Sequence, residues 1–205
     1  MNRSELYDWT VSGPWTEKNE QTDTEWKWKL EDGILFLAFK GSTSRMDWLQ
    51  NFSFWIRPYR KQPILWFAHA GFVRKWKSVR EDVFRLIEQM QDQFVMVSAS
   101  GFSQGGAVAI LCHEDLKFRS ISKIVCSTTY GAPRVVWFWN RWKIHPRFLG
   151  IDRYEIKSDV VPKLPPGWMG YRRVGGCLLL GERTFSWPWE WETIHMSYRK
   201  YLEEI

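Results

Sequence analysis

Residues 94–116 constrain the fold more than any other part of the chain, because a strand, a sharp turn and a helix follow one another there. Residues 94–97 are an apolar run, and residues 107–116 suit a helix. Ser103 stands at the apex between Gly101 and Gly105, where missing Cβ atoms allow the backbone of a tight turn to approach its neighbours. The stretch therefore predicts an elbow that projects a serine hydroxyl out of a sheet, towards the N-terminal N–H groups of a helix.

Glycine-rich turns also produce the G-x-S-x-G pattern by chance, so a catalytic elbow needs partners elsewhere in the chain. A serine hydroxyl is a poor nucleophile until a base takes its proton, and histidine has the appropriate pKa. His195 follows a proline- and tryptophan-rich loop at the start of the last predicted helix, from which it could reach the elbow. Asp159 stands at the end of a predicted strand, residues 153–157, and we expect it to orient the imidazole. The alternative for Asp159 is an ordinary salt bridge.

The other three histidines fit structural roles. His113 lies on the elbow's own helix and faces away from the apex, and His69 follows a buried strand. His145 precedes a proline in a segment that has no clear assignment.

Apolar runs alternate with helical patterns along the chain, which favours an α/β fold with a mainly parallel sheet flanked by helices. An Asp-Gly turn between two runs predicts an early hairpin, and antiparallel strands are expected at both ends of the sheet. No linker or repeat interrupts the pattern, so residues 1–205 are expected to form a single domain. Strands are expected at 24–30, 34–39, 64–68, 94–97, 124–129 and 153–157, a β-ribbon at 171–180, and a long helix at 71–91.

Charge and cysteine usage exclude several kinds of function. The net charge is +6, but the basic residues are scattered, so we expect no nucleic-acid partner. The three cysteines lack metal-ligand spacing, and no metal or cofactor is expected. No apolar run approaches the length of a membrane span, and the first residues contain no secretory leader. These features predict a cytoplasmic protein.

Six stretches, in the same order, resemble the class 3 lipase family, which includes the filamentous-fungal triacylglycerol lipases. The likeness runs from about residue 35 to the C-terminus. The stretches are FKGSTSRMDWL at 39–49, HAGF at 69–72, GFSQGG at 101–106, TYGAPRV at 129–135, SDVVPKLPP at 158–166 and HMSY at 195–198.

The resemblance implies an α/β-hydrolase that cleaves carboxylic esters of lipids through an acyl-enzyme. It makes Ser103 the nucleophile, His195 the base and Asp159 the orienting acid. The oxyanion hole would use the backbone N–H groups of Ser42 and Gln104. Lipid or small acyl esters would be the substrates, with transient contact to a lipid interface.

The resemblance also implies a short lid helix at residues 43–54. Opening of the lid would expose Trp48, Leu49 and Phe52 as an apolar patch. The alternative is an amphipathic helix that stays packed.

Phe102 departs from the family pattern, which usually has histidine or another polar residue before the serine. The sequence GFSQGG instead resembles the elbow sequence of acyl-protein thioesterases and carboxylesterases, and cutinases have a similar one. Phe102 is thus a candidate acyl-site residue, and a hydrolase of those types is the second hypothesis. Without a leader or disulfides, a compact intracellular or phage-type esterase fits better than a secreted lipase. Further alternatives are an inactive hydrolase fold and a non-catalytic protein that binds membrane surfaces.

Overall fold

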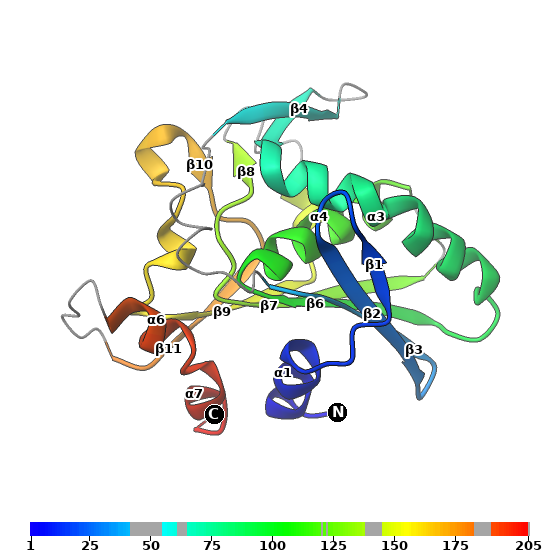
Figure 1. Ribbon diagram of the computed structural model, residues 1–205, viewed down its shortest axis with the longest axis horizontal. Coiled ribbons are helices and arrows are strands. Elements are labelled where there is room, and N and C mark those ends of the chain that lie inside the picture. The colour runs from blue at the N-terminus through cyan, green and yellow to red at the C-terminus, as the bar shows by residue number, and fades with distance from the viewer. Residues whose placement is uncertain are drawn as a thin grey trace.

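A seven-stranded sheet forms the centre of the molecule, with helices on both of its faces (Figure 1). The computed structural model describes residues 1–41, 55–60, 65–119, 121, 123–137, 145–182 and 190–204. The strand order is β1-β2-β3-β6-β7-β9-β11, and every pair from β3 to β11 is parallel. The strands are β1 (Glu17–Asn19), β2 (Thr24–Glu31), β3 (Ile34–Phe39), β6 (Met96–Phe102), β7 (Ile124–Tyr130), β9 (Ile151–Ile156) and β11 (Gly176–Leu180). The predicted mainly parallel sheet is confirmed.

The predicted hairpin joins β2 and β3. Asp32 and Gly33 both have positive φ values, 50° and 70°, and Glu31 faces Ile34 in an antiparallel register. A two-residue loop with these angles matches the right-handed twist of the flanking strands, which is why the Asp-Gly sequence predicts it.

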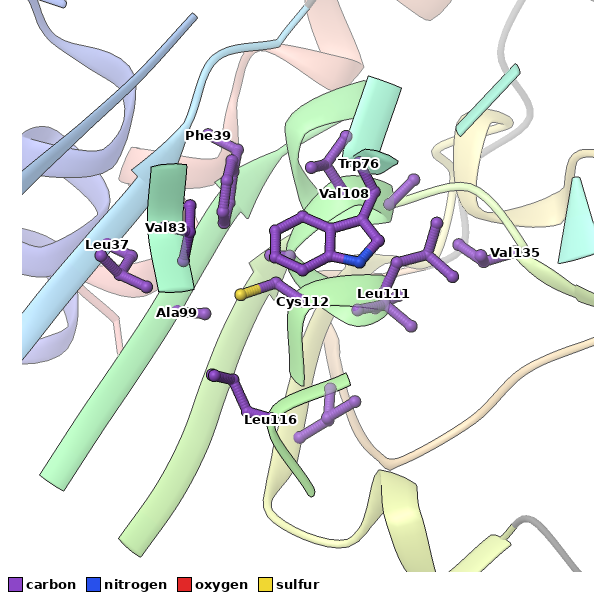
Figure 2. Close-up of a cluster of buried hydrophobic side chains, with 14 of the residues drawn as sticks. Leu37, Phe39, Trp76, Val83, Ala99, Val108, Leu111, Cys112, Leu116 and Val135 are labelled. Atoms are coloured by element: carbon purple, nitrogen blue, oxygen red, sulfur yellow. The ribbon is translucent and has the colours of Figure 1, made fainter. Parts of the chain in front are cut away.

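Two long helices cover one face of the sheet, α3 (Ala70–Gln89) and α4 (Gln104–Phe118). Trp76 of α3 is completely buried between the helices, and Figure 2 shows its ring among Phe39, Val108 and Cys112. Its indole N–H donates to a carboxylate oxygen of Asp115 on α4 at 3.0 Å. This bond satisfies the one polar atom of a large apolar side chain, so the tryptophan can fill the core at no hydrogen-bonding cost.

Helices α1 (Arg3–Val11) and α7 (Tyr198–Leu202) lie on the other face, near the two chain ends in Figure 1. No element was predicted from the sequence before residue 24, so α1 was missed. Its N-terminus is a capping box, in which the Asn2 side chain accepts from the Glu5 N–H and the Glu5 carboxylate accepts from the Asn2 N–H. This N-x-x-E spacing was the signal available in the sequence. Thr10 fixes the helix to β6 through a buried hydrogen bond to Ser100 at 2.8 Å.

The remaining strands form a second, four-stranded sheet that the sequence did not predict. Its order is β10-β8-β5-β4 and all of its pairs are antiparallel. The strands are β4 (Ile56–Arg60), β5 (Trp66–His69), β8 (Val136–Trp137) and β10 (Tyr171–Arg172).

The β-ribbon predicted at residues 171–180 is wrong, because its two halves belong to different sheets. Strand β10 pairs with β8, whereas β11 pairs in parallel with β9. The predicted late antiparallel strand is therefore wrong as well. Gly175 separates the halves with φ +76°, and a Cβ there would lie 2.7 Å from the carbonyl oxygen of Ile151. The chain passes so close to β9 at this point that it joins the central sheet.

Buried histidines should make the fold sensitive to acid. Burial lowers the pKa of His113 from its ordinary 6.5 to about 4, and that of His69 in the same way to about 4. As pH falls, the two histidines bind protons in the unfolded chain before they do so in the folded one. The stability that is present above pH 6.5 is therefore lost between about pH 6.5 and pH 4.

We expect His113→Gln to reduce this pH dependence. Each histidine should contribute a loss of about 2 kcal/mol in the free energy of unfolding between pH 7 and 5. Urea denaturation of both proteins at the two pH values measures the difference. An equal loss in the variant and the parent would show that His113 does not titrate in this way.

Candidate active site

The predicted elbow joins β6 to α4, with Ser103 between them. Ser103 has φ 53° and ψ −124°, a conformation rare for a residue with a side chain. Cβ atoms at Gly101 and Gly105 would overlap the backbone of Gly105 and of Phe39, respectively. Helix α4 can therefore start directly after Ser103 and lie against the ends of β3 and β6, as the glycine spacing predicted.

Asp159 and His195 are brought together at the carboxyl ends of the parallel strands. One Asp159 carboxylate oxygen lies 2.6 Å from Nδ1 of His195, and both side chains are buried. The N–H of Val161 donates to the other carboxylate oxygen at 2.9 Å. Asp159 lies three residues beyond the end of β9, and its carboxylate is thus fixed in place by the short 3₁₀ turn η2 (Val161–Lys163).

The second ring nitrogen of His195 is not engaged by another described group. Its Nε2 is buried and makes no hydrogen bond with any residue that the structure describes. The imidazole stacks on Phe102 with ring centroids 4.6 Å apart, and Phe102 directly precedes Ser103. A Cβ at Gly131 would lie 2.7 Å from Cε1 of the same ring. The imidazole therefore lies between the elbow and the loop after β7.

The last residue of β7 also holds the elbow. The Ser103 N–H donates to the Tyr130 carbonyl at 2.8 Å, one residue before Gly131. Ser103 and His195 thus lie against the same short segment of the chain. The predicted nucleophile, base and acid all lie at this edge of the sheet.

The oxyanion and lid residues are only partly described. Gln104 is the first residue of α4, where backbone N–H groups have no partner within the helix. Ser42, Trp48, Leu49, Phe52 and the lid at 43–54 lie outside the described residues. The preceding residue, Gly41, is close to the elbow, since a Cβ on it would lie 3.8 Å from Cβ of Ser103.

Two tyrosines at the site were not assigned a role from the sequence. Tyr198 donates to Asp159 at 2.9 Å and accepts from the Ile156 N–H at 3.1 Å. Burial raises the pKa of Tyr198 well above its usual value, so its hydroxyl keeps its proton and remains a donor. Tyr7 of α1 packs edge-on against Phe102 and stacks on Tyr198. The available signals were the HMSY stretch and the capping box of α1.

The other histidines do not join the site. His113 is buried, with its ring nitrogens 2.9 Å from the Ser127 hydroxyl and 3.0 Å from the Leu149 carbonyl. His69 is buried against Phe72, and His145 is exposed in the 3₁₀ turn η1 (His145–Phe148). His195 itself ends α6 (Trp191–His195), whereas the sequence predicted it at the start of the last helix.

Removal of the Tyr198 hydroxyl should destabilise the site's buried polar network. Tyr198→Phe takes one donor from Asp159 and leaves the Ile156 N–H without its acceptor, which we expect to lower the free energy of unfolding by about 1–3 kcal/mol. Chemical denaturation measures this. Tyr201→Phe on the same helix is the matched control, and a loss as large in the control would contradict the assigned role.

Comparison with known proteins places these features in a family context. Residues 36–168 match the family model described as lipase (class 3). The chain is 30% identical over 158 residues to a lipase of Rhizomucor miehei, covering 69% of this chain and 40% of that protein. It is 30% identical over 148 residues to secreted mono- and diacylglycerol lipase A of Penicillium cyclopium, and this match covers 70% of this chain and 47% of that protein.

Solved structures agree with the sequence relatives. Lipase II of Rhizopus niveus superposes with a TM-score of 0.72 at 25% identity, over 80% of this chain and 64% of that one. The lipase of Rhizopus microsporus var. chinensis superposes with a TM-score of 0.73 at 26% identity, over 83% of this chain and 61% of that one. The chain spans only about a third to a half of the length of the curated relatives it matches.

The predicted cytoplasmic localisation is wrong. The finding that overturns it is that relatives of the chain include proteins named as secreted mono- and diacylglycerol lipases. The prediction depended on finding no apolar leader, but leaders are removed from mature secreted chains and their absence does not decide the compartment. Within the described ranges, no helix is long and apolar enough to cross a membrane.

Proposed function

This chain belongs to the class 3 lipase family, and we propose that it hydrolyses the carboxylic esters of lipids through a serine acyl-enzyme, acting as a single α/β-hydrolase domain. The observation that carries the proposal is the 2.6 Å contact between Asp159 and Nδ1 of His195. The opposite nitrogen of that ring is left buried beside the elbow that holds Ser103.

In the proposed reaction, Nε2 of His195 takes the proton of Ser103 as the hydroxyl oxygen attacks the ester carbonyl. The N–H groups of Gln104 and Ser42 stabilise the negative charge on the carbonyl oxygen. His195 then gives its proton to the leaving alcohol, and a water molecule releases the acid by the same steps in reverse. Asp159 holds the imidazole in the tautomer that has its proton on Nδ1 and stabilises the imidazolium.

The thioesterase- or cutinase-like alternative is not favoured, because the family match and the relatives are lipases. Lipid esters are therefore the substrates that we propose, and contact with a lipid surface is part of the proposal. The side chains of Trp168 and Trp55 are 85% and 75% exposed. Trp55 lies near β10, since the Tyr171 hydroxyl is 3.5 Å from the Trp55 carbonyl, and Trp168 belongs to the turn η3 (Gly167–Met169) just before β10. Two exposed indoles in this region are suited to a membrane–water boundary.

Ser103→Ala should abolish hydrolysis of p-nitrophenyl esters. We expect a loss of about 10⁴-fold or more in kcat, because the nucleophile and its base act as one unit. Ser12→Ala, at an exposed serine after α1, is the matched control and should keep full activity. Equal activity in Ser103→Ala and the parent would rule out the proposed mechanism.

A series of esters from acetate to palmitate, together with emulsified triglyceride, tests the substrate class. We expect activity on long acyl chains and on the emulsion, since the family acts on lipid esters. Activity confined to short soluble esters would contradict lipase activity. Liposome binding with no hydrolysis of any ester would favour the non-catalytic membrane-binding alternative.

A further inference from the structure

Four arginines from three parts of the chain line one depression in the surface. Arg134 follows β7, Arg153 belongs to β9, and Arg172 and Arg173 lie at and just after the end of β10. The depression is shallow and open to solvent. Apolar residues, among them Ile110 and Val174, complete its lining. We refer to the four arginines as the arginine cluster.

The positive charge of the arginine cluster is only partly neutralised. Glu155 is the acid that faces it, and both of its carboxylate oxygens are occupied, one by Arg153 and the other by Arg173 at 3.0 Å. Arg134 donates to the neutral carbonyl of Pro165 at 2.9 Å. Among the described residues, one carboxylate therefore faces the guanidinium groups of Arg134, Arg153 and Arg173, which leaves an excess of positive charge around the depression.

Arg153 has one side-chain N–H donor, Nε, that is not used by the described residues around the depression. Its side chain is 6% exposed, and its Nε makes no hydrogen bond within the described part of the chain. Buried guanidinium groups normally have all their donors satisfied, because an unpaired buried donor costs about 1–3 kcal/mol. An unsatisfied donor beside a depression points to a missing acceptor.

The arginines also repel one another. Burial lowers the pKa of Arg134, and the neighbouring charge of Arg173 lowers it further, while Glu155 raises it. Burial lowers the pKa of Arg153 as well. The charge of Glu155 raises that pKa, and the charge of Arg173 lowers it further. An anion in the depression would relieve this repulsion and the desolvation of both groups.

We propose that the arginine cluster binds a phosphate group. The planar guanidinium fork matches two oxygens of a phosphate, and charge-assisted hydrogen bonds of this kind are about twice as strong as neutral ones. The phosphate belongs either to a free anion or to the head group of an anionic lipid. The site is separate from Ser103, Asp159 and His195, and its test is a binding measurement that does not depend on hydrolysis.

Isothermal titration with inorganic phosphate, at constant ionic strength set with chloride, tests the site. We expect saturable binding to the parent protein that Arg134→Gln and Arg173→Gln each weaken by about 10-fold. Arg134→Lys keeps the charge but loses the fork, and should weaken binding less than Arg134→Gln. Arg199→Gln is the matched control, since it removes one positive charge from an exposed arginine that pairs with Asp8.

Failure of phosphate to bind the parent would overturn the proposal, as would equal weakening by Arg199→Gln. If Arg173→Gln does not fold after Glu155 loses that partner, the two variants at Arg134 still decide the question. Sedimentation with vesicles of ether-linked phosphatidic acid in phosphatidylcholine separates the two sources of phosphate without offering an ester to cleave. Co-sedimentation that is lost in Arg134→Gln supports the head group, and phosphate binding without co-sedimentation supports the free anion.

Discussion

The close approach of backbone segments around Ser103 is the constraint on which the rest of the molecule depends. Three glycines permit it, because a Cβ at Gly101, Gly105 or Gly106 would meet the helix backbone, the end of β3 or the loop after β7. Helix α4 therefore begins at the sheet surface with no intervening loop, and all its residues from 105 to 116 are buried. Ser103 is held at a positive φ that costs on the order of 1–3 kcal/mol, and its N–H bond to Tyr130 helps to hold it there. A single packing requirement thus fixes both the central helix and the position of the serine between β6 and α4.

Features with strong local patterns could be predicted from the sequence. The Asp-Gly hairpin, the long amphipathic helix α3 and the elbow each depend on a turn type or on a period that one segment contains by itself. Asp159 and His195 were identifiable for a related reason, since a strand end and a late loop bring side chains to one edge of a parallel sheet.

Features that depend on distant neighbours could not be predicted in this way. Strands β8 and β10 have two residues each, too few for a periodic pattern. Their pairing joins residues that are 34 and 36 positions apart in the chain, Trp137 with Tyr171 and Val136 with Arg172. Tyr198 contacts Asp159, which is 39 positions away in the chain. Tyr7, in the N-terminal helix α1, packs against Phe102. The sequence shows that these residues are aromatic, but only the fold shows that both pack against Phe102, the ring on which His195 stacks.

Burial alone does not distinguish the histidines, because His69, His113 and His195 are all buried. The difference lies in the partners. His113 lies against a hydroxyl and a carbonyl, which cannot offset the desolvation of a charged ring, whereas His195 contacts a carboxylate. An imidazole that must gain a proton during a reaction needs such a counter-charge.

Phe102 increases the importance of that counter-charge. Its ring covers one face of the His195 imidazole, while Tyr198 packs edge-on against the same imidazole, so water is excluded from much of its surface. Exclusion of water strengthens the electrostatic interactions that the ring makes with its remaining partners, because the local dielectric constant is lower than that of water. A polar residue at position 102 would share the stabilisation of charge, but phenylalanine leaves most of it to Asp159. The three donors that hold the Asp159 carboxylate, from His195, Val161 and Tyr198, are therefore as much a part of the proposed chemistry as the histidine itself.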